Sequence, residues 1–253
     1  MVGVLQEARK SSPRRARWLL CRPLGQEAVR TASVFRVLSD RLAREGCDIL
    51  RFDYHGTGDS PGDEEQQSLT AWVEDTLAAH EQLTPPSGTP THWFGMGLGA
   101  TLALGAALRA ASPPDHLVLW EPVLNGAAYL RTLIEAHRAE LSREFGLPWP
   151  RLLRMGKAAE PQVPGDVLGF QMGYQLADDL QQLSGLSLAP ALKRGIRVTC
   201  AVHTEQRREL GGREEHTLLK MISPETRTDW MSSQAMGTAI VPVDLPRTLL
   251  STL

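Results

Sequence analysis

The chain has 253 residues, of which 42% are hydrophobic and 22% are charged, which is enough for one sizeable core. Its 27 basic and 29 acidic residues give a formal net charge of -2, too balanced to attract nucleic acid strongly. No apolar run approaches the ~18 residues of a membrane span, and the N-terminus lacks the apolar core of a secretion signal. We expect one cytoplasmic domain over residues 1–253, without a membrane span or nucleic-acid partner.

Strands and helices alternate over the first half of the sequence. Short apolar runs predict four buried strands, at 18–21, 48–52, 91–94 and 117–120. Apolar residues at helical spacing predict helices between them, at about 34–46, 69–77 and 100–110. This alternation predicts a mostly parallel sheet flanked by helices on both faces. Because ligands of such sheets bind beyond the carboxyl ends of the strands, the residues that follow each strand are the site candidates.

The alternation stops near residue 127. From there to about residue 191, helical segments are interrupted by prolines, and we interpret 127–191 as a helical insertion that forms a lid over the carboxyl edge of the sheet. The core resumes with an apolar strand at 196–202. A short extended segment at 239–242 and a helix at 245–253 are expected to close the chain.

The turn Gly95-Met96-Gly97-Leu98-Gly99 has the frame of a nucleophile elbow, G-x-S-x-G. The outer glycines allow the turn to pack tightly, and the central residue is presented to the pocket. That residue is Gly97, which has no side chain and can neither attack a carbonyl nor carry an acyl group. A dinucleotide-binding loop is disfavoured, because the G-x-G-x-x-G spacing is missing.

Further segments occur with this turn in a familiar order and spacing. They are Pro23-Leu24-Gly25-Gln26-Glu27, the stretch Leu50–Ser60 and the stretch Trp120–Gly126. Together they resemble the bacterial exosortase-A-system-associated hydrolases, a branch of the serine-aminopeptidase-like α/β hydrolases. The second type in that branch is the closer match, and its members also often lack serine at the elbow. The resemblance covers about the first 130 residues well and implies an α/β-hydrolase fold.

The resemblance also implies where a ligand binds. The backbone of Leu24 and Gly25 corresponds to the oxyanion loop, and the amide of Leu98 to the second oxyanion donor. We expect an apolar cavity between the insertion and the sheet, with Gly97 as its floor. Glu121 follows a strand at the same edge, where it binds a basic group or makes a structural hydrogen bond. The predicted ligand-binding residues are Leu24, Gly25, Met96, Gly97, Leu98 and Glu121.

The other members of a catalytic triad are missing from their expected places. In the parent superfamily an acid follows a late strand and a histidine follows the last one, but here His203 and Glu205 follow the late strand. No histidine occurs after His216. His203 and Glu205 are weak candidates for an acid–base pair, since neighbours in a loop often point apart. Cys200 is a displaced nucleophile or, as we favour, a buried strand residue.

The three cysteines and the surface carboxylates show no spacing that predicts a metal site, and no cofactor is expected. Three hypotheses for function remain open. The first is a catalytically degenerate protein that binds a small-molecule or peptide intermediate in a bacterial biosynthetic pathway. The second is an enzyme without a covalent intermediate, namely a cyclase, isomerase or hydrolase of an ester, thioester or peptide. The third is an assembly subunit, with a second copy or a pathway protein as its partner.

Overall fold

The computed structural model describes residues 1–9, 15–83, 88–161, 163, 165–210, 216–225, 230 and 241–253. Residues 239 and 240 of the predicted extended segment lie outside these ranges. No helix in the described ranges combines the length and apolarity that crossing a bilayer requires.

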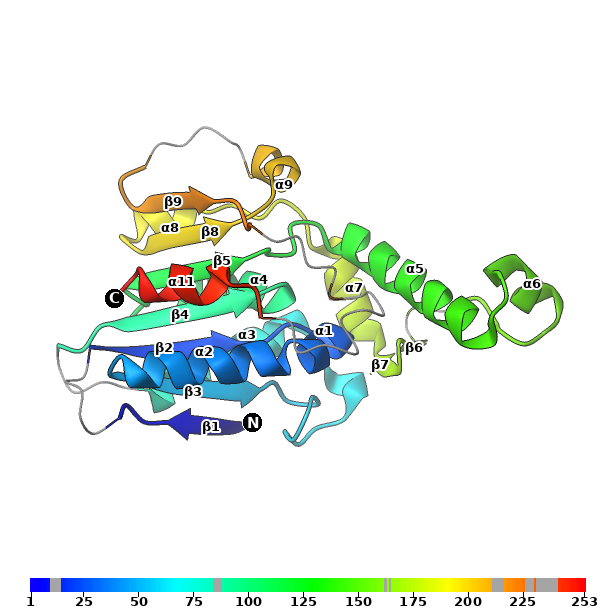
Figure 1. Ribbon diagram of the computed structural model, residues 1–253, viewed down its shortest axis with the longest axis horizontal. Coiled ribbons are helices and arrows are strands. Elements are labelled where there is room, and N and C mark those ends of the chain that lie inside the picture. Colours follow the sequence, from blue (N-terminus) through cyan, green and yellow to red (C-terminus); the bar gives the residue numbers. More distant parts are fainter. Residues whose placement is uncertain are drawn as a thin grey trace.

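A seven-stranded sheet forms the centre of the molecule (Figure 1). Its strands, in spatial order, are β1 (Val2–Gln6), β3 (Cys47–Asp53), β2 (Ala16–Cys21), β4 (Thr91–Met96), β5 (His116–Trp120), β8 (Arg197–Ala201) and β9 (Leu219–Ile222). β1 pairs with β3 in antiparallel register, and the other pairs are parallel. The predicted mostly parallel sheet is therefore confirmed, and its parallel strands bring their carboxyl ends to one edge.

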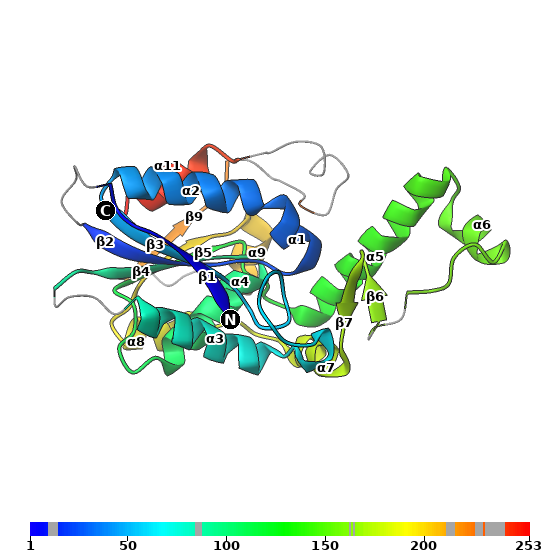
Figure 2. The same cartoon turned by 90° about the horizontal axis from the view of Figure 1, so that it is seen from below.

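Helices cover both faces of the sheet (Figure 2). One face carries α2 (Ala32–Arg44) and α11 (Asp244–Leu250), and the other carries α3 (Leu69–Gln82), α4 (Leu98–Arg109) and α8 (Ala189–Lys193). Successive side chains of a strand point to opposite faces, so each buried strand supplies two cores. In β4, for example, Trp93 belongs to the core beneath α4, whereas Phe94 belongs to the core beneath α2.

The sequence did not predict the two edge strands, β1 and β9. Four of the five residues of β1 are exposed, and no residue of β9 is fully buried. An edge strand that buries few side chains carries only a weak apolar signal. The central strands were recognised because most of their residues are buried on both faces of the sheet.

A helical insertion separates β5 from α8. It comprises α5 (Gly126–Phe145), α6 (Trp149–Arg154), the hairpin of β6 (Gly165–Val167) and β7 (Phe170–Met172), and α7 (Tyr174–Gln182). α5 runs away from the carboxyl edge, with α6 at its far end (Figures 1 and 2). α8 begins within the predicted range 127–191, but it packs on α4 as part of the main body.

The second half of the insertion returns to the edge of the sheet. There it meets α1 (Gly25–Arg30) and the short helix η1 (Glu64–Gln66). The side chain of Gln26 donates a hydrogen bond to the Leu168 carbonyl at 3.1 Å. The backbone amide of Leu69 donates to the Asp179 carboxylate at 2.8 Å. These bonds fix β7 and α7 over the loops that follow β2 and β3.

Candidate functional site

The turn between β4 and α4 lies at the centre of the carboxyl edge. Gly97 has φ 56° and ψ -128°, and its carbonyl accepts a hydrogen bond from the Ala100 amide at 3.1 Å. An added Cβ at Gly95 would lie 2.5 Å from the Ala100 Cα, and one at Gly99 would lie 2.2 Å from the Arg22 carbonyl oxygen. Both flanking positions therefore accept only glycine, which gives the turn the frame of a nucleophile elbow.

Two side chains lie beside Gly97, those of Pro23 in the loop after β2 and of Glu27 in α1. A Cβ at position 97 would lie 3.3 Å from the Pro23 Cβ and 3.4 Å from Glu27 Oε2. Gly97 itself is half-buried, and it is not among the residues that line the cavity beside this turn. Sequence reasoning quoted Glu27 within a motif but gave it no role.

Glu27 is held by a residue of the insertion. The phenol of Tyr129, in α5, donates a hydrogen bond to Glu27 Oε2 at 2.9 Å. Burial, reinforced by the neighbouring Glu27 carboxylate, raises the pKa of Tyr129 well above its ordinary value. Tyr129 consequently stays protonated at neutral pH and acts as a donor. This bond joins α1 to α5 and holds Glu27 Oε2 3.4 Å from where a Cβ at position 97 would lie.

A second carboxylate, that of Glu121, lies just beyond the end of β5, the strand next to β4. Glu121 follows β5, and its Oε1 lies 2.8 Å from Nε2 of His203, which follows β8. The two side chains are each 20% exposed. Glu121 has φ 46°, an uncommon conformation for a residue with a Cβ that is found preferentially at functional sites. The contact is an ion pair when the imidazole is protonated.

The sequence-based pairing of His203 with Glu205 is not the contact that the structure forms. His203 caps the N-terminus of α9 (Thr204–Glu209), and its amide bonds the Gln206 side chain at 3.4 Å. Glu205 is exposed in the first turn of that helix. The imidazole reaches Glu121 instead, because parallel pairing of β5 with β8 brings the ends of these two strands side by side.

A cavity of about 330 Å³ lies beside the elbow turn. The loop after β2, the loop after β3, the start of α4 and β7 form its walls. The apolar side chains that line it are those of Pro23, Leu24, Ala28, Val29, Phe52, Tyr54, Trp72, Leu98, Leu102 and Phe170. Of the six predicted ligand-binding residues, Leu24, Gly25 and Leu98 line this cavity.

The other three predicted residues lie elsewhere. Gly97 lies beside Pro23 and Glu27, and Glu121 contacts His203. Met96 belongs to the core on the opposite face, beneath α2. Its position follows from strand alternation: β4 extends to Met96, which therefore shares a face with Phe94.

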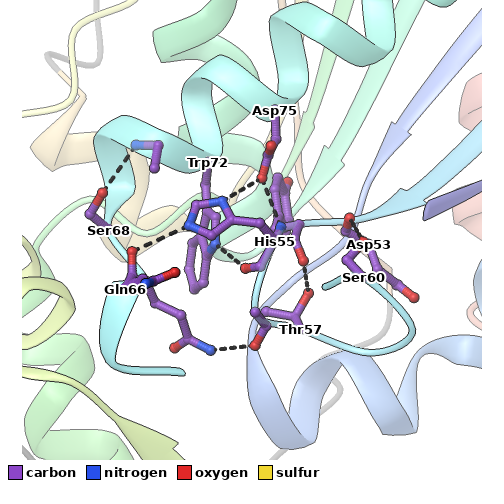
Figure 3. Close-up of polar contacts among 12 residues, drawn as sticks. Asp53, His55, Thr57, Ser60, Gln66, Ser68, Trp72 and Asp75 are labelled. Atoms are coloured by element: carbon purple, nitrogen blue, oxygen red, sulfur yellow. Dashed lines mark hydrogen bonds and ion pairs between the residues drawn. The ribbon is translucent and has the colours of Figure 1, made fainter. Parts of the chain in front are cut away.

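The loop after β3, which lines one side of the cavity, is fastened to α3 by polar contacts (Figure 3). The ring of His55 contacts the Asp75 carboxylate through Nδ1 at 2.9 Å and the Gln66 carbonyl through Nε2 at 3.2 Å. The indole of Trp72 donates to the His55 carbonyl at 3.1 Å. His55 thus orders the loop through its contacts with neighbouring segments.

The polar end of the cavity is an ion pair. The guanidinium of Arg22 contacts the Asp53 carboxylate and also donates to the Ala28 carbonyl at 3.0 Å. Asp53 accepts a further bond from the Asp59 amide at 3.2 Å. The bond from Arg22 to Ala28 ties the loop after β2 to α1, and the ion pair with Asp53 ties it to the end of β3. The cavity is therefore formed without a ligand.

Cys200 does not resemble a reactive thiol. It is fully buried in β8, and burial raises its pKa to about 12. A nucleophilic cysteine needs a stabilised thiolate, which this environment opposes. In the part of the chain that the structure describes, no group of three or more histidine, cysteine and acidic residues is arranged to hold a metal ion.

A mostly parallel sheet with an antiparallel first strand, helices on both faces and a glycine-framed turn from β4 into α4 define an α/β-hydrolase fold. The chain belongs to the serine aminopeptidase S33 family, whose sequence model matches residues 27–169. The match includes Glu27, the elbow turn, Glu121 and the first part of the insertion.

Solved structures share this fold at low sequence identity. Est1E from Butyrivibrio proteoclasticus, determined with ferulic acid bound, aligns with a TM-score of 0.60 and 12% identity, covering 99% of this chain and 94% of that one. An esterase from Exiguobacterium antarcticum aligns with a TM-score of 0.60 and 16% identity, covering 99% of this chain and 94% of the esterase. The enol-lactonase from Burkholderia xenovorans LB400 aligns with a TM-score of 0.56 and 16% identity, covering 98% of this chain and 95% of the enol-lactonase.

Two uncharacterized proteins of Mycobacterium tuberculosis, from strains H37Rv and CDC 1551, are more similar in sequence. Each is 35% identical to this chain over 123 residues, which is 44% of this chain and 42% of the relative. The match thus spans less than half the length of these curated relatives.

The geometry at Gly97 makes a prediction for Gly97→Ser. The new hydroxyl would lie beside Glu27, but the sequence has no histidine beyond His216 to act as its base. We expect hydrolysis of nitrophenyl esters at least about 10⁴-fold below that of a working triad, and no fast labelling by a fluorophosphonate. Turnover typical of an esterase would show that another group serves as the base.

Proposed function

We propose that this chain is a catalytically degenerate α/β-hydrolase-like protein that binds a small-molecule or peptide intermediate of a biosynthetic pathway. One observation carries the proposal: the nucleophile position of the elbow turn is a glycine, Gly97, while a formed cavity lies beside the turn. The loss of the serine removes acyl transfer by the usual route, but it leaves the cavity intact. Fold alone does not decide function, so the argument rests on this site.

The walls of the cavity favour a ligand with an apolar body and a polar end. Aromatic and aliphatic side chains supply most of the lining, and Arg22 and Asp53 supply charge at one side. A volume of about 330 Å³ lies at the lower end of the range for small-molecule sites. An acyl group, an aromatic acid derivative or the side chain of a short peptide has suitable size and chemistry.

The test is a thermal-shift screen of acyl esters, acyl thioesters, aromatic acids and short peptides. A ligand of the folded state, present at a hundred times its dissociation constant, stabilises the protein by about 2.7 kcal/mol. Ala28→Trp should abolish the shift, because Ala28 lines the cavity and the indole would fill it. The matched control is Ala78→Trp, at an exposed position of α3.

Loss of the shift in Ala28→Trp, with the shift kept in Ala78→Trp, supports binding in this cavity. Equal stabilisation of the parent and of Ala28→Trp by each hit would contradict it. A screen in which no compound raises the melting temperature would favour the assembly-subunit hypothesis.

The pair of Glu121 and His203 favours a second candidate function, an enzyme that moves a proton without a covalent intermediate. A carboxylate carried on a backbone of positive φ and in contact with an imidazole is a suitable acid–base pair. If a screened ester, thioester or peptide is converted, His203→Gln should lower kcat by about 10²-fold or more with little change in KM. Unchanged turnover in His203→Gln would remove this pair from the reaction.

A further inference from the structure

The far end of the insertion is a separate surface of the molecule. We call residues 143–157 the tip; they comprise the last turn of α5, the following turn, α6 and its C-terminal turn. Figures 1 and 2 show α6 at the point farthest from the sheet. α5 has 20 residues, so it holds the tip about 30 Å from the carboxyl edge.

The tip is a folded unit. Gly146, at φ 61°, ends α5, and the Leu147 amide donates back to the Ser142 carbonyl at 3.1 Å. Leu152 is fully buried. The indole of Trp149 donates to the Glu160 carboxylate at 3.3 Å. The surface that the tip presents is therefore defined by this packing.

The charge of the tip differs in sign from that of the whole chain. It contains four basic residues and one acidic residue, a formal charge of +3, whereas the chain has a net charge of -2. Arg143 is paired with Glu140. Arg151, Arg154 and Lys157 are exposed, and no carboxylate of the described residues forms an ion pair with them. Three cations thus face solvent together.

Apolar side chains lie among these cations. Phe145 is 43% exposed and Met155 is 50% exposed, and both belong to the few large apolar side chains that the described surface leaves open. Cations surrounding exposed apolar side chains are the composition of segments that bind at a membrane surface. The cations meet lipid phosphates while the apolar groups enter the acyl boundary.

We propose that the tip is a docking site for an anionic lipid surface. A protein partner is disfavoured by size, because a stable protein interface takes about 20 to 30 residues on each side, more than this narrow projection offers. A lipid surface needs no complementary shape. Binding through α6 would leave the cavity open to water about 30 Å from the lipid. The proposal is independent of what the cavity binds.

The experiment is co-sedimentation of the full chain with vesicles of phosphatidylcholine alone or mixed with phosphatidylserine. We expect association with the anionic vesicles that weakens with added salt, and little with phosphatidylcholine alone. Replacing Arg151, Arg154 and Lys157 together by glutamate should weaken binding by about a hundredfold or more, since each cation near a membrane contributes about fivefold. Replacing Lys193, Arg207 and Arg208 by glutamate is the matched control, with the same change of charge on exposed residues of the main body.

A second measurement reports contact directly. The three native cysteines are buried, so a thiol introduced by Phe145→Cys can be labelled selectively with a polarity-sensitive dye. Its emission should shift to the blue on anionic vesicles, whereas a dye at Ala78→Cys on α3 should not respond. Absence of sedimentation with anionic vesicles, equal loss in the two triple variants, or no shift at position 145 would each overturn the proposal. If the tip binds an acidic protein but not anionic vesicles, the lipid proposal is overturned and a protein partner is indicated.

Discussion

Replacing Gly99 by alanine should destabilise the fold by roughly 3 kcal/mol or more, or prevent folding. The new methyl group would lie 2.2 Å from the Arg22 carbonyl oxygen and 2.5 Å from that of Cys21. Both atoms are backbone of the strand β2 and its following loop, at the centre of the sheet edge, and neither can move without displacing the sheet. Chemical denaturation, or the yield of folded protein, measures the effect.

Gly105→Ala is the matched control, because it adds the same methyl group to the same helix. There the new Cβ would lie 3.3 Å from one methyl of Val73, a side chain that can shift. The gain in helix propensity, about 1 kcal/mol, opposes this small crowding, so stability should change by no more than about 1 kcal/mol. Similar stabilities for the two variants would show that the close packing of α4 on the Arg22 loop is not required.

The second large effect is a loss of stability in mild acid. His92 in β4 and His116 in β5 are buried side by side, with ring centroids 5.7 Å apart. Burial lowers the pKa of each to about 4 from 6.5; for His92, Asp115 opposes this shift and Arg197 adds to it. For His116, the neighbouring His92, Arg197 and Lys220 lower the pKa further.

The direction of the effect follows from the two pKa values. The folded protein keeps both rings neutral down to about pH 4, whereas the unfolded chain binds protons as the pH falls below 6.5. The stabilising contribution is thus complete above pH 6.5 and is lost as the pH falls toward 4. Each histidine accounts for up to about 3 kcal/mol, and urea midpoints between pH 7.5 and pH 4.5 measure the total.

His92→Phe separates this effect from the titration of carboxylates. The ring of His92 packs edge-on against Trp18, a contact that phenylalanine can keep. His92 Nδ1 has no hydrogen-bond partner in the described part of the chain, so removing this nitrogen breaks no hydrogen bond and costs little folding stability. The variant should match or exceed the parent at pH 7.5 and lose about half as much stability on acidification. An unchanged pH profile would rule out His92 as a source.

The sequence predicted the parts of the fold that depend on local patterns. The central strands, α2, α3 and the glycine-framed turn carry their periodicity and turn residues within short segments. The edge strands β1 and β9 escaped because exposed strands lack that periodicity. Because parallel strands end at one edge, the loops after β2 and β4 meet, and Leu24, Gly25 and Leu98 line the cavity there; Gly97 is not among its lining residues.

The missing contacts join residues far apart in the sequence. Glu27 and Tyr129 are 102 positions apart, and their contact depends on how α5 leaves the sheet. Glu121 and His203 meet only because β5 and β8 are neighbours, whereas sequence proximity favoured Glu205. Met96 was misplaced for a simpler reason: the strand was ended two residues early, which hid its alternation with Phe94.

The carboxylate beside Gly97 also has a consequence for building acyl transfer into this chain by design. A serine at position 97 would place its Cβ 3.4 Å from Glu27 Oε2, which Tyr129 holds through a hydrogen bond. A triad would also need a histidine as its base, and the sequence has none after His216. Because triad members act together, an engineered esterase would have to receive the serine and its base at the same time.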